Sequence, residues 1–213
     1  IYLNISSKKK EFTFRGDSNI DRKISYIELI KLINKNCFMP LTWGGGIRSL
    51  GEIEEILMSG ADKVSLNTMV IEDTNAIKEA IKRFGSQVIV ASADVKKIDN
   101  NYIVFSNNGK KNTKLNIEDW IKKVNDLNVG EVLIQSIDRD GSGKGYDIEL
   151  LKKIKKISKS KIIFLGGVGK YEDFIDAVKN GANGLAAANI WHYKELVDLN
   201  VKKILKKNNI NVR

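Results

Sequence analysis

The stretch Leu41-Thr-Trp-Gly-Gly-Gly-Ile-Arg48 has a counterpart much further along the chain, Phe164-Leu-Gly-Gly-Val-Gly-Lys170. The glycine pair Gly45-Gly46 aligns with Gly166-Gly167 at an offset of 121 residues, and the next Gly-Ala dipeptide of each copy keeps that offset. Similarity within one chain at so large a spacing indicates two duplicated half-domains, because the repeats of solenoid proteins are much shorter.

In each copy the paired glycines follow an apolar run and precede a helical pattern. A residue without Cβ lets backbone N–H groups approach an oxyanion, and the start of a helix adds partial positive charge. Glycines at this place can also serve only the turn between a strand and a helix, so one copy alone leaves both interpretations open. Two copies predict a ligand that carries two phosphates.

The composition is that of an ordinary globular protein, with 42% hydrophobic and 29% charged residues in 213. The single cysteine, Cys37, excludes an internal disulfide and fits a cytoplasmic location. Neither Cys37 nor the single histidine, His192, has a catalytic partner nearby in the sequence, so packing is the favoured role for both.

The net charge of +10 comes mostly from lysines spread along helical patterns, which is typical of solvated helix faces. No nucleic-acid-binding motif accompanies this charge, whereas a phosphorylated small molecule would benefit from the same positive field. The apolar runs are too short to span a bilayer, and the first residues do not resemble a signal peptide.

Apolar runs and helical patterns alternate regularly along the chain. We expect a strand at residues 1–5, in a chain whose beginning is missing, then a long exposed loop at 6–24 and a helix at 26–33. Further strands are expected at 38–43, 62–66, 87–94, 131–137, 161–165 and 184–187, and helices at 50–59, 72–84, 116–128, 147–158, 171–180 and 193–207. A hairpin is expected around the turn Asp99-Asn100-Asn101.

This alternation predicts a parallel sheet covered by helices, either an open doubly wound sheet or a closed eight-stranded barrel. The duplication favours a (β/α)8 barrel built of two half-barrel repeats. The chain would form a single barrel domain over residues 1–213, with its first strand and helix apparently missing. The site of such a barrel lies at the C-terminal ends of its strands.

Polar residues at these strand ends are the candidates for chemistry. Asp94 closes the apolar run Val88-Ile-Val-Ala-Ser-Ala93, so a dry interior behind it would raise the pKa of its carboxyl and suit it to acid–base catalysis. The alternative is an aspartate that caps the next turn. The segment Ser136–Asp147 is expected to be a loop that covers the substrate, although alone it would also fit a flexible acidic loop or a weak cation site.

Several ordered segments along nearly the whole chain carry a family resemblance. They are Leu41–Arg48, Gly60–Thr68, Phe84–Gln87, Ser106–Thr113, Ser136–Asp147 and Asn209–Arg213. Together they resemble the cyclase subunit of imidazole glycerol phosphate synthase, a (β/α)8 barrel of histidine biosynthesis. The resemblance implies a complex in which a glutaminase subunit releases ammonia, which crosses the barrel to a bisphosphorylated aminoimidazole-carboxamide ribonucleotide. It implies no cofactor and no metal.

The same resemblance assigns roles to individual residues. Asp94 would be one of two catalytic carboxylates, and Asp140 would support it in the site. The residues implied to bind one phosphate are Gly46, Asn67 and Thr68, and those implied to bind the other are Gly141, Gly167, Ala188 and Asn189. Lys63 and Glu131 would belong to a charged gate for ammonia, and Asp62 would face the glutaminase.

The chain also departs from the family pattern. The family's other catalytic aspartate and a substrate-binding lysine lie on a first strand and loop that these residues lack, which implies impaired cyclisation without them. Asn4 stands in place of an aspartate, Gln135 in place of a hydroxyl residue, and Leu165 and Asn189 in place of serines. These departures resemble a paralogous branch associated with acetamidino modification of surface sugars, which would pass ammonia to a sugar amidotransferase. A non-catalytic scaffold for the glutaminase is the other alternative.

Overall fold

The computed structural model describes residues 1–3, 11–12 and 24–212. Most of the loop expected at residues 6–24 lies outside these ranges, as does Asn4. The chain divides into two compact units, Ile1–Val90 and Ala91–Arg213, which we describe separately. Each unit contains one of the two glycine loops, as the duplication predicts.

The first unit contains parallel strands at the expected places. Strand β1 (Tyr2–Leu3) pairs with β4 (Thr42–Gly44), and β4 pairs with β5 (Lys63–Leu66). A short antiparallel pair, β2 (Glu11–Phe12) and β3 (Ile24–Ser25), precedes the first helix. Trp43 of β4 is buried, and its ring stacks on that of Tyr2 with 4.5 Å between centroids.

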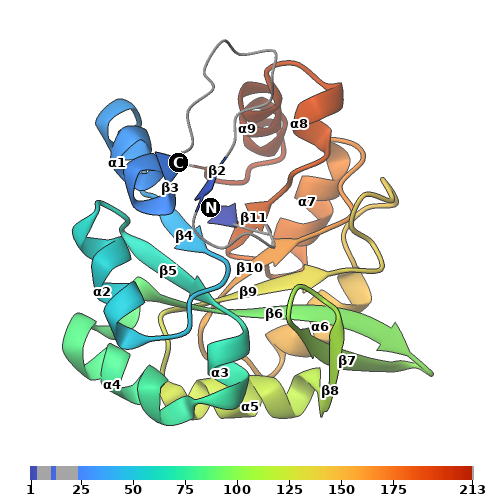
Figure 1. Cartoon of the computed structure of the whole chain (residues 1–213). Helices are drawn as coiled ribbons and strands as arrows, with labels where there is room; N and C mark the ends of the chain where they lie inside the picture. Colours follow the sequence, from blue (N-terminus) through green and yellow to red (C-terminus); the bar gives the residue numbers. More distant parts are fainter. Residues whose placement is uncertain (4–10, 13–23, 213) are drawn as a thin grey trace. The chain divides into compact units, whose positions relative to one another are not determined.

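The helices of the first unit follow its strands (Figure 1). They are α1 (Tyr26–Asn36), α2 (Leu50–Met58), α3 (Thr68–Glu72), α4 (Thr74–Phe84) and the short 3-10 helix η1 (Ser86–Val88). Helix α1 begins at a capping box, in which Ser25 and Glu28 satisfy each other's backbone N–H groups. Helix α2 packs against α1, α4 and β5. It begins at Leu50, shortly after the first glycine loop.

The second unit begins within β6 (Ile89–Ile98) and continues the same alternation. Strands β9 (Glu131–Ser136), β10 (Lys161–Leu165) and β11 (Gly184–Ala186) pair in parallel and in sequence order. Strand β7 (Asn101–Ser106) pairs antiparallel with β6, and β8 (Lys111–Asn116) pairs antiparallel with β7.

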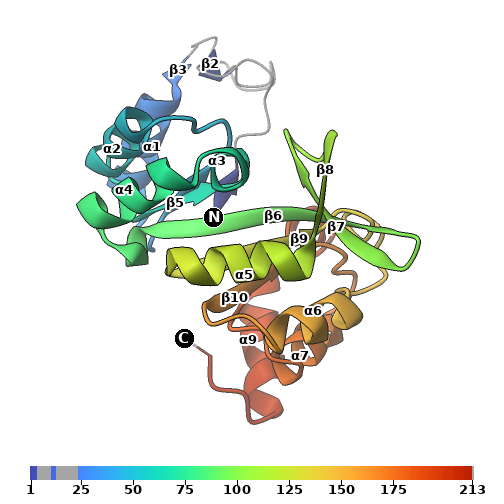
Figure 2. The ribbon, with the colours of Figure 1, turned by 90° about the horizontal axis from the view of Figure 1, so that it is seen from below.

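The helices of the second unit pack consecutively beside these strands. They are α5 (Ile117–Leu127), α6 (Ile148–Lys155), α7 (Glu172–Lys179), α8 (Ile190–Tyr193) and α9 (Val197–Lys207). Helix α6 contacts α5 and α7, and α7 contacts α9, so that these helices lie next to one another in Figure 2. The alternation of parallel strand and helix predicted from the sequence is therefore confirmed in each unit.

Two predicted boundaries are wrong for reasons of backbone chemistry. The strand expected at 38–43 begins only at Thr42, and the side chains of Phe38 and Met39 are 98% and 73% exposed. Pro40 has no N–H to donate to a sheet, so the apolar run before it remains outside the ladder. The helix expected at 72–84 begins only at Thr74, because Asp73 leaves the helical conformation and accepts a hydrogen bond from the Ala76 N–H as the cap of α4. The short helix α3 before it was not predicted.

Two further differences arise in the second unit. The strand expected to end at Asp94 continues to Ile98, because β7 pairs with its outer half; the hairpin at Asp99–Asn101 is confirmed, but β8 was not predicted. The helix expected at 193–207 is interrupted, since Leu196 adopts a left-handed conformation with φ of 48° between α8 and α9. Among the described residues, none of the helices is long and apolar enough to cross a membrane.

Candidate active site

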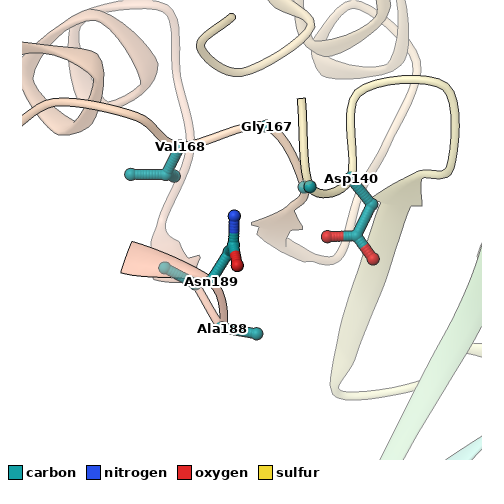
Figure 3. A pocket seen from close by; sticks show the side chains of 8 residues that line it. Asp140, Gly167, Val168, Ala188 and Asn189 are labelled. Atoms are coloured by element: carbon teal, nitrogen blue, oxygen red, sulfur yellow. The ribbon is translucent and has the colours of Figure 1, made fainter. Parts of the chain in front are cut away.

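The glycine loop of the second unit borders a small hollow at the C-terminal ends of three parallel strands. Gly166 and Gly167 have φ of 104° and 100°, a conformation that glycine adopts at little cost. Three segments line the hollow: the loop after β9, the glycine loop after β10 and the turn after β11 (Figure 3). The lining residues are Asp140, Gly141, Gly166, Gly167, Val168, Ala187, Ala188 and Asn189.

Backbone N–H groups on two sides of this hollow are available to an anion. In the described part of the chain, the N–H groups of Gly167, Val168, Ala188 and Asn189 donate to no protein acceptor. The next two N–H groups of the glycine loop, those of Gly169 and Lys170, instead donate to the carboxylate of Asp173. Donors facing a hollow from two loops can bind a phosphate.

Two side chains add polarity to the same hollow. The amide of Asn189 points into the space between Val168 and Asp140 (Figure 3). The carboxylate of Asp140 accepts a hydrogen bond of 3.0 Å from the side-chain amide of Gln135. The structure thus brings Asp140, Gly141, Gly167, Ala188 and Asn189 together around one hollow, as expected for a shared site.

Asp94 lies on β6 in the same unit, between the fully buried Ala93 and Val95. Burial raises the pKa of its carboxyl to about 6, although a hydrogen bond from the Gly109 N–H acts in the opposite direction. The predicted rise is therefore confirmed. Its predicted place at the strand end is wrong, because Asp94 pairs with Phe105 of β7 in the middle of the extended strand.

The acidic loop Ser136–Asp147 is held by specific hydrogen bonds. Asp138 accepts from the Lys97 N–H at 2.6 Å, and Ile137 donates to the Val95 carbonyl, which ties the loop to β6 beyond Asp94. Asp147 caps α6 by accepting from the Leu150 N–H. Asp138 and Asp147 thus each accept a hydrogen bond from a backbone N–H group. Within the described ranges, no group of three or more histidine, cysteine or acidic side chains could hold a metal.

The glycine loop of the first unit has a capping carboxylate at the equivalent position. Gly46 has φ of 75°, and the N–H of Arg48 donates to the Glu52 carboxylate at 2.7 Å, which satisfies one donor at the start of α2. Asn67 follows β5 directly, and its side-chain oxygen is buried without a partner among the described residues. Thr68 begins α3 beside it. Asn67 and Thr68 keep the 121-residue offset to Ala188 and Asn189.

The residues expected at the ammonia gate lie at the opposite ends of their strands from the glycine loops. Lys63 begins β5, and Glu131 begins β9, where Lys161 is its neighbour in the register with β10. Asp62 accepts a hydrogen bond of 2.7 Å from the Leu41 N–H. Cys37 is half-buried and His192 is exposed, outside the hollow described above.

Gly109 and Tyr146 have no individual role predicted from the sequence, although Gly109 donates to Asp94 and Tyr146 donates to Ala186 beside the hollow. Gly109 ends the turn Asn107-Asn108-Gly109, whose three residues all have positive φ. Consecutive asparagine and glycine residues directly after an apolar strand are a turn signal that would have predicted this hairpin. Tyr146 had no comparable signal, since its contacts are made with residues distant in the sequence.

Parallel strands alternating with helices, with a glycine loop at the C-terminal strand ends, define the class of β/α-barrel proteins. Residues 17–197 match the histidine biosynthesis protein family, and the chain belongs to this family. The fold class is therefore the predicted (β/α)8 barrel.

Similar proteins carry one common name, imidazole glycerol phosphate synthase subunit HisF. The subunit from Campylobacter concisus is 43% identical over 187 residues, covering 88% of this chain and 74% of the relative. Those from Sulfolobus acidocaldarius and a Thermotoga species are 42% and 36% identical over 196 residues, covering 92% of this chain and 78% of each relative. The predicted resemblance to this subunit is confirmed.

Proposed function

We propose that the chain is the cyclase subunit of an imidazole glycerol phosphate synthase and acts as a lyase in histidine biosynthesis. The observation that carries the proposal is its identity of 36–43% to subunits of that name, over about nine-tenths of the chain. The hollow of the second unit, which glycine-loop residues border, and the raised pKa of Asp94 support it, since the proposed substrate is phosphorylated and the chemistry transfers protons.

Each glycine loop would bind one phosphate of the bisphosphorylated ribonucleotide. Gly141, Gly167, Ala188 and Asn189 would hold one phosphate through the N–H groups that border the hollow. The residues proposed for the other phosphate are Gly46, Asn67 and Thr68, by analogy with the second copy of the repeat.

Asp94 would transfer protons during attack by ammonia and closure of the imidazole ring. A carboxyl whose pKa lies near 6 can take up and return a proton close to neutral pH, whereas one with its ordinary value of 3.8 would be a poor acid there. Asp140, which borders the phosphate hollow, would hold the substrate on the same side. In the family that the chain resembles, two carboxylates transfer these protons. Asp94 is the one of the two that we assign in this chain.

The word subunit in the relatives' name supports a partner, and we propose a glutaminase that supplies ammonia. Lys63 and Glu131, at the N-terminal ends of their strands, would form part of the gate through which ammonia enters, and Asp62 would face the partner. A cytoplasmic location is proposed with this role.

The decisive experiment supplies the protein and a glutaminase with glutamine and the bisphosphorylated ribonucleotide, and measures imidazole glycerol phosphate. A parallel assay replaces the glutaminase by an ammonium salt. Asp94→Asn should lower kcat by about 10²–10⁴-fold in both assays, as expected for loss of an acid–base group. Asp126→Asn, at an exposed position on α5, is the matched control and should leave kcat unchanged.

Lack of turnover in both assays would sink the cyclase proposal. If the glutaminase nevertheless binds and is activated, the chain would instead be an ammonia-supplying paralogue or a scaffold. The bond between Gln135 and Asp140 is the observation that favours this alternative, because a side-chain amide there occupies an oxygen of Asp140 that a substrate would otherwise contact.

A further inference from the structure

A short segment of the loop after β9, residues 143–146, contacts both of the other chain segments that border the phosphate hollow. We call these four residues the brace. On one side it lies against the glycine loop after β10, and on the other it reaches the carbonyl end of β11. None of its residues was implied to bind phosphate, and Gly143–Tyr146 do not line the hollow themselves.

The contact with the glycine loop is made by backbone against backbone. The N–H of Gly145 donates to the carbonyl of Gly167 at 2.8 Å. A Cβ placed on Gly167 would lie 2.2 Å from the carbonyl oxygen of Gly145, and one on Gly169 would lie 2.2 Å from that of Gly143. Such distances leave no room for any side chain, so the brace determines where the glycine loop lies.

The contact with β11 is made by one side chain. The hydroxyl of Tyr146 donates to the carbonyl of Ala186 at 3.0 Å, two residues before the N–H donors of Ala188 and Asn189 begin. Tyr146 is only 4% exposed, and its ring packs edge-on against those of Phe164 and Phe174 at 5.9 Å. Burial, followed by the charge of Asp173, raises the pKa of the Tyr146 hydroxyl, which therefore remains a donor.

Asp173 strengthens the same arrangement from α7. Its buried carboxylate accepts from the N–H groups of Gly169 and Lys170 at 2.9 and 3.0 Å, which fixes the far end of the glycine loop. Consequently the donors of Gly167 and Val168 lie between the brace and Asp173. The segment that carries those of Ala188 and Asn189 is joined to the brace by the hydroxyl of Tyr146, and the indole N–H of Trp191 donates to the Ala187 carbonyl of the same segment.

We propose that Tyr146 is a positioning residue for phosphate binding, which holds the N–H donors after β11 at the correct distance from those of the glycine loop. The inference rests on the proposed function, because it concerns the phosphate hollow of that site. Tyr146 does not touch the substrate; it acts through Ala186. Its loss should therefore weaken binding of the phosphorylated substrate without changing the chemical step.

The test compares Tyr146→Phe with Tyr102→Phe. Both substitutions delete one hydroxyl from a buried tyrosine of the second unit, but the Tyr102 hydroxyl donates to Asp147, which retains its bond from Leu150. We expect Tyr146→Phe to raise KM for the bisphosphorylated ribonucleotide and Kd for inorganic phosphate by about three- to tenfold, the effect of one hydrogen bond, with kcat unchanged. Tyr102→Phe should leave all three values unchanged.

The outcomes separate this inference from the proposed function. If the unsubstituted protein binds neither the bisphosphorylated ribonucleotide nor inorganic phosphate, the proposed function fails first. If it binds both and Tyr146→Phe binds them equally well, the positioning role is wrong. Equal losses of affinity in the two variants would also overturn it, since they would reflect general destabilisation.

Discussion

The two glycine loops share a sequence pattern, yet they need their glycines for different reasons. At Gly46 a Cβ would meet no atom within 4 Å, so only the φ of 75° favours glycine. At Gly167 the φ is 100°, and a Cβ would also lie 2.2 Å from the carbonyl oxygen of Gly145. Duplication preserved the turn, while the surroundings of the second copy added a packing constraint.

The capping of the two loops, in contrast, is the same. In the first unit the N–H of Arg48 donates to the Glu52 carboxylate, and in the second unit the N–H of Gly169 donates to the Asp173 carboxylate. Both residues of the second pair lie 121 positions after those of the first. The capping carboxylate therefore belongs to the duplicated motif, and the close backbone contact at Gly167 is what distinguishes the second loop.

Among the substitutions that test this comparison, Gly167→Ala should lower the free energy of unfolding most. A methyl group would collide with backbone that cannot rotate away, and the left-handed conformation would be strained as well, so unfolding should require about 3–5 kcal/mol less free energy. Denaturant unfolding measures this loss. If Gly167→Ala lost no more free energy of unfolding than Gly46→Ala, the brace would have moved to make room for the methyl group. The contrast between the two loops would then be wrong.

A second prediction concerns the free energy of unfolding, which the buried carboxyl of Asp94 makes dependent on pH. Folding raises the pKa of Asp94 from 3.8 to about 6, so the folded state binds this proton more tightly than the unfolded state. Stability should therefore fall as pH rises from about 4 to 6, and the charged form above pH 6 should cost on the order of 3 kcal/mol.

Asp94→Asn removes this titration. The variant should be more stable than the unsubstituted protein by on the order of 3 kcal/mol at pH 8, and the difference should vanish near pH 4, where Asp94 is neutral. Thermal unfolding at the two pH values checks the prediction. A stability difference independent of pH would contradict the burial of a charged carboxylate.

The smallest effect is expected at Gly46→Ala. With no neighbour within 4 Å, the new methyl group meets only the conformational cost of φ at 75°, about 1 kcal/mol. The same unfolding experiment as for Gly167→Ala gives the value. A loss of several kcal/mol would mean that the first loop is constrained as tightly as the second.

Much of this protein was predictable, because strand and helix patterns depend on local spacing. The βα alternation, the hairpin at Asp99–Asn101 and the raised pKa of Asp94 all follow from apolar runs and the residues that end them. The errors fall where a local pattern is overridden. Phe38 and Met39 form an apolar run that Pro40 keeps out of the sheet, and Leu196 interrupts a helical pattern with a left-handed residue.

The candidate site was predictable to a similar extent. Gly167, Ala188 and Asn189 could be placed together because parallel strands end at one edge of a sheet. The roles of Gly145 and Tyr146 were not predictable, since Gly145 bonds to Gly167 and Tyr146 bonds to Ala186, 40 positions away, and no periodicity records such contacts.

The sequence by itself determined the duplicated architecture, the family and the two glycine loops, because turn chemistry and repeat spacing are local properties of a chain. Only the tertiary structure decided that the brace lies against the second loop, whereas within the described residues a Cβ on Gly46 of the first loop would meet no atom within 4 Å. The reason is physical: backbone groups of distant segments meet only after folding, and the distance from a Cβ on Gly167 to the Gly145 carbonyl exists only in the folded protein.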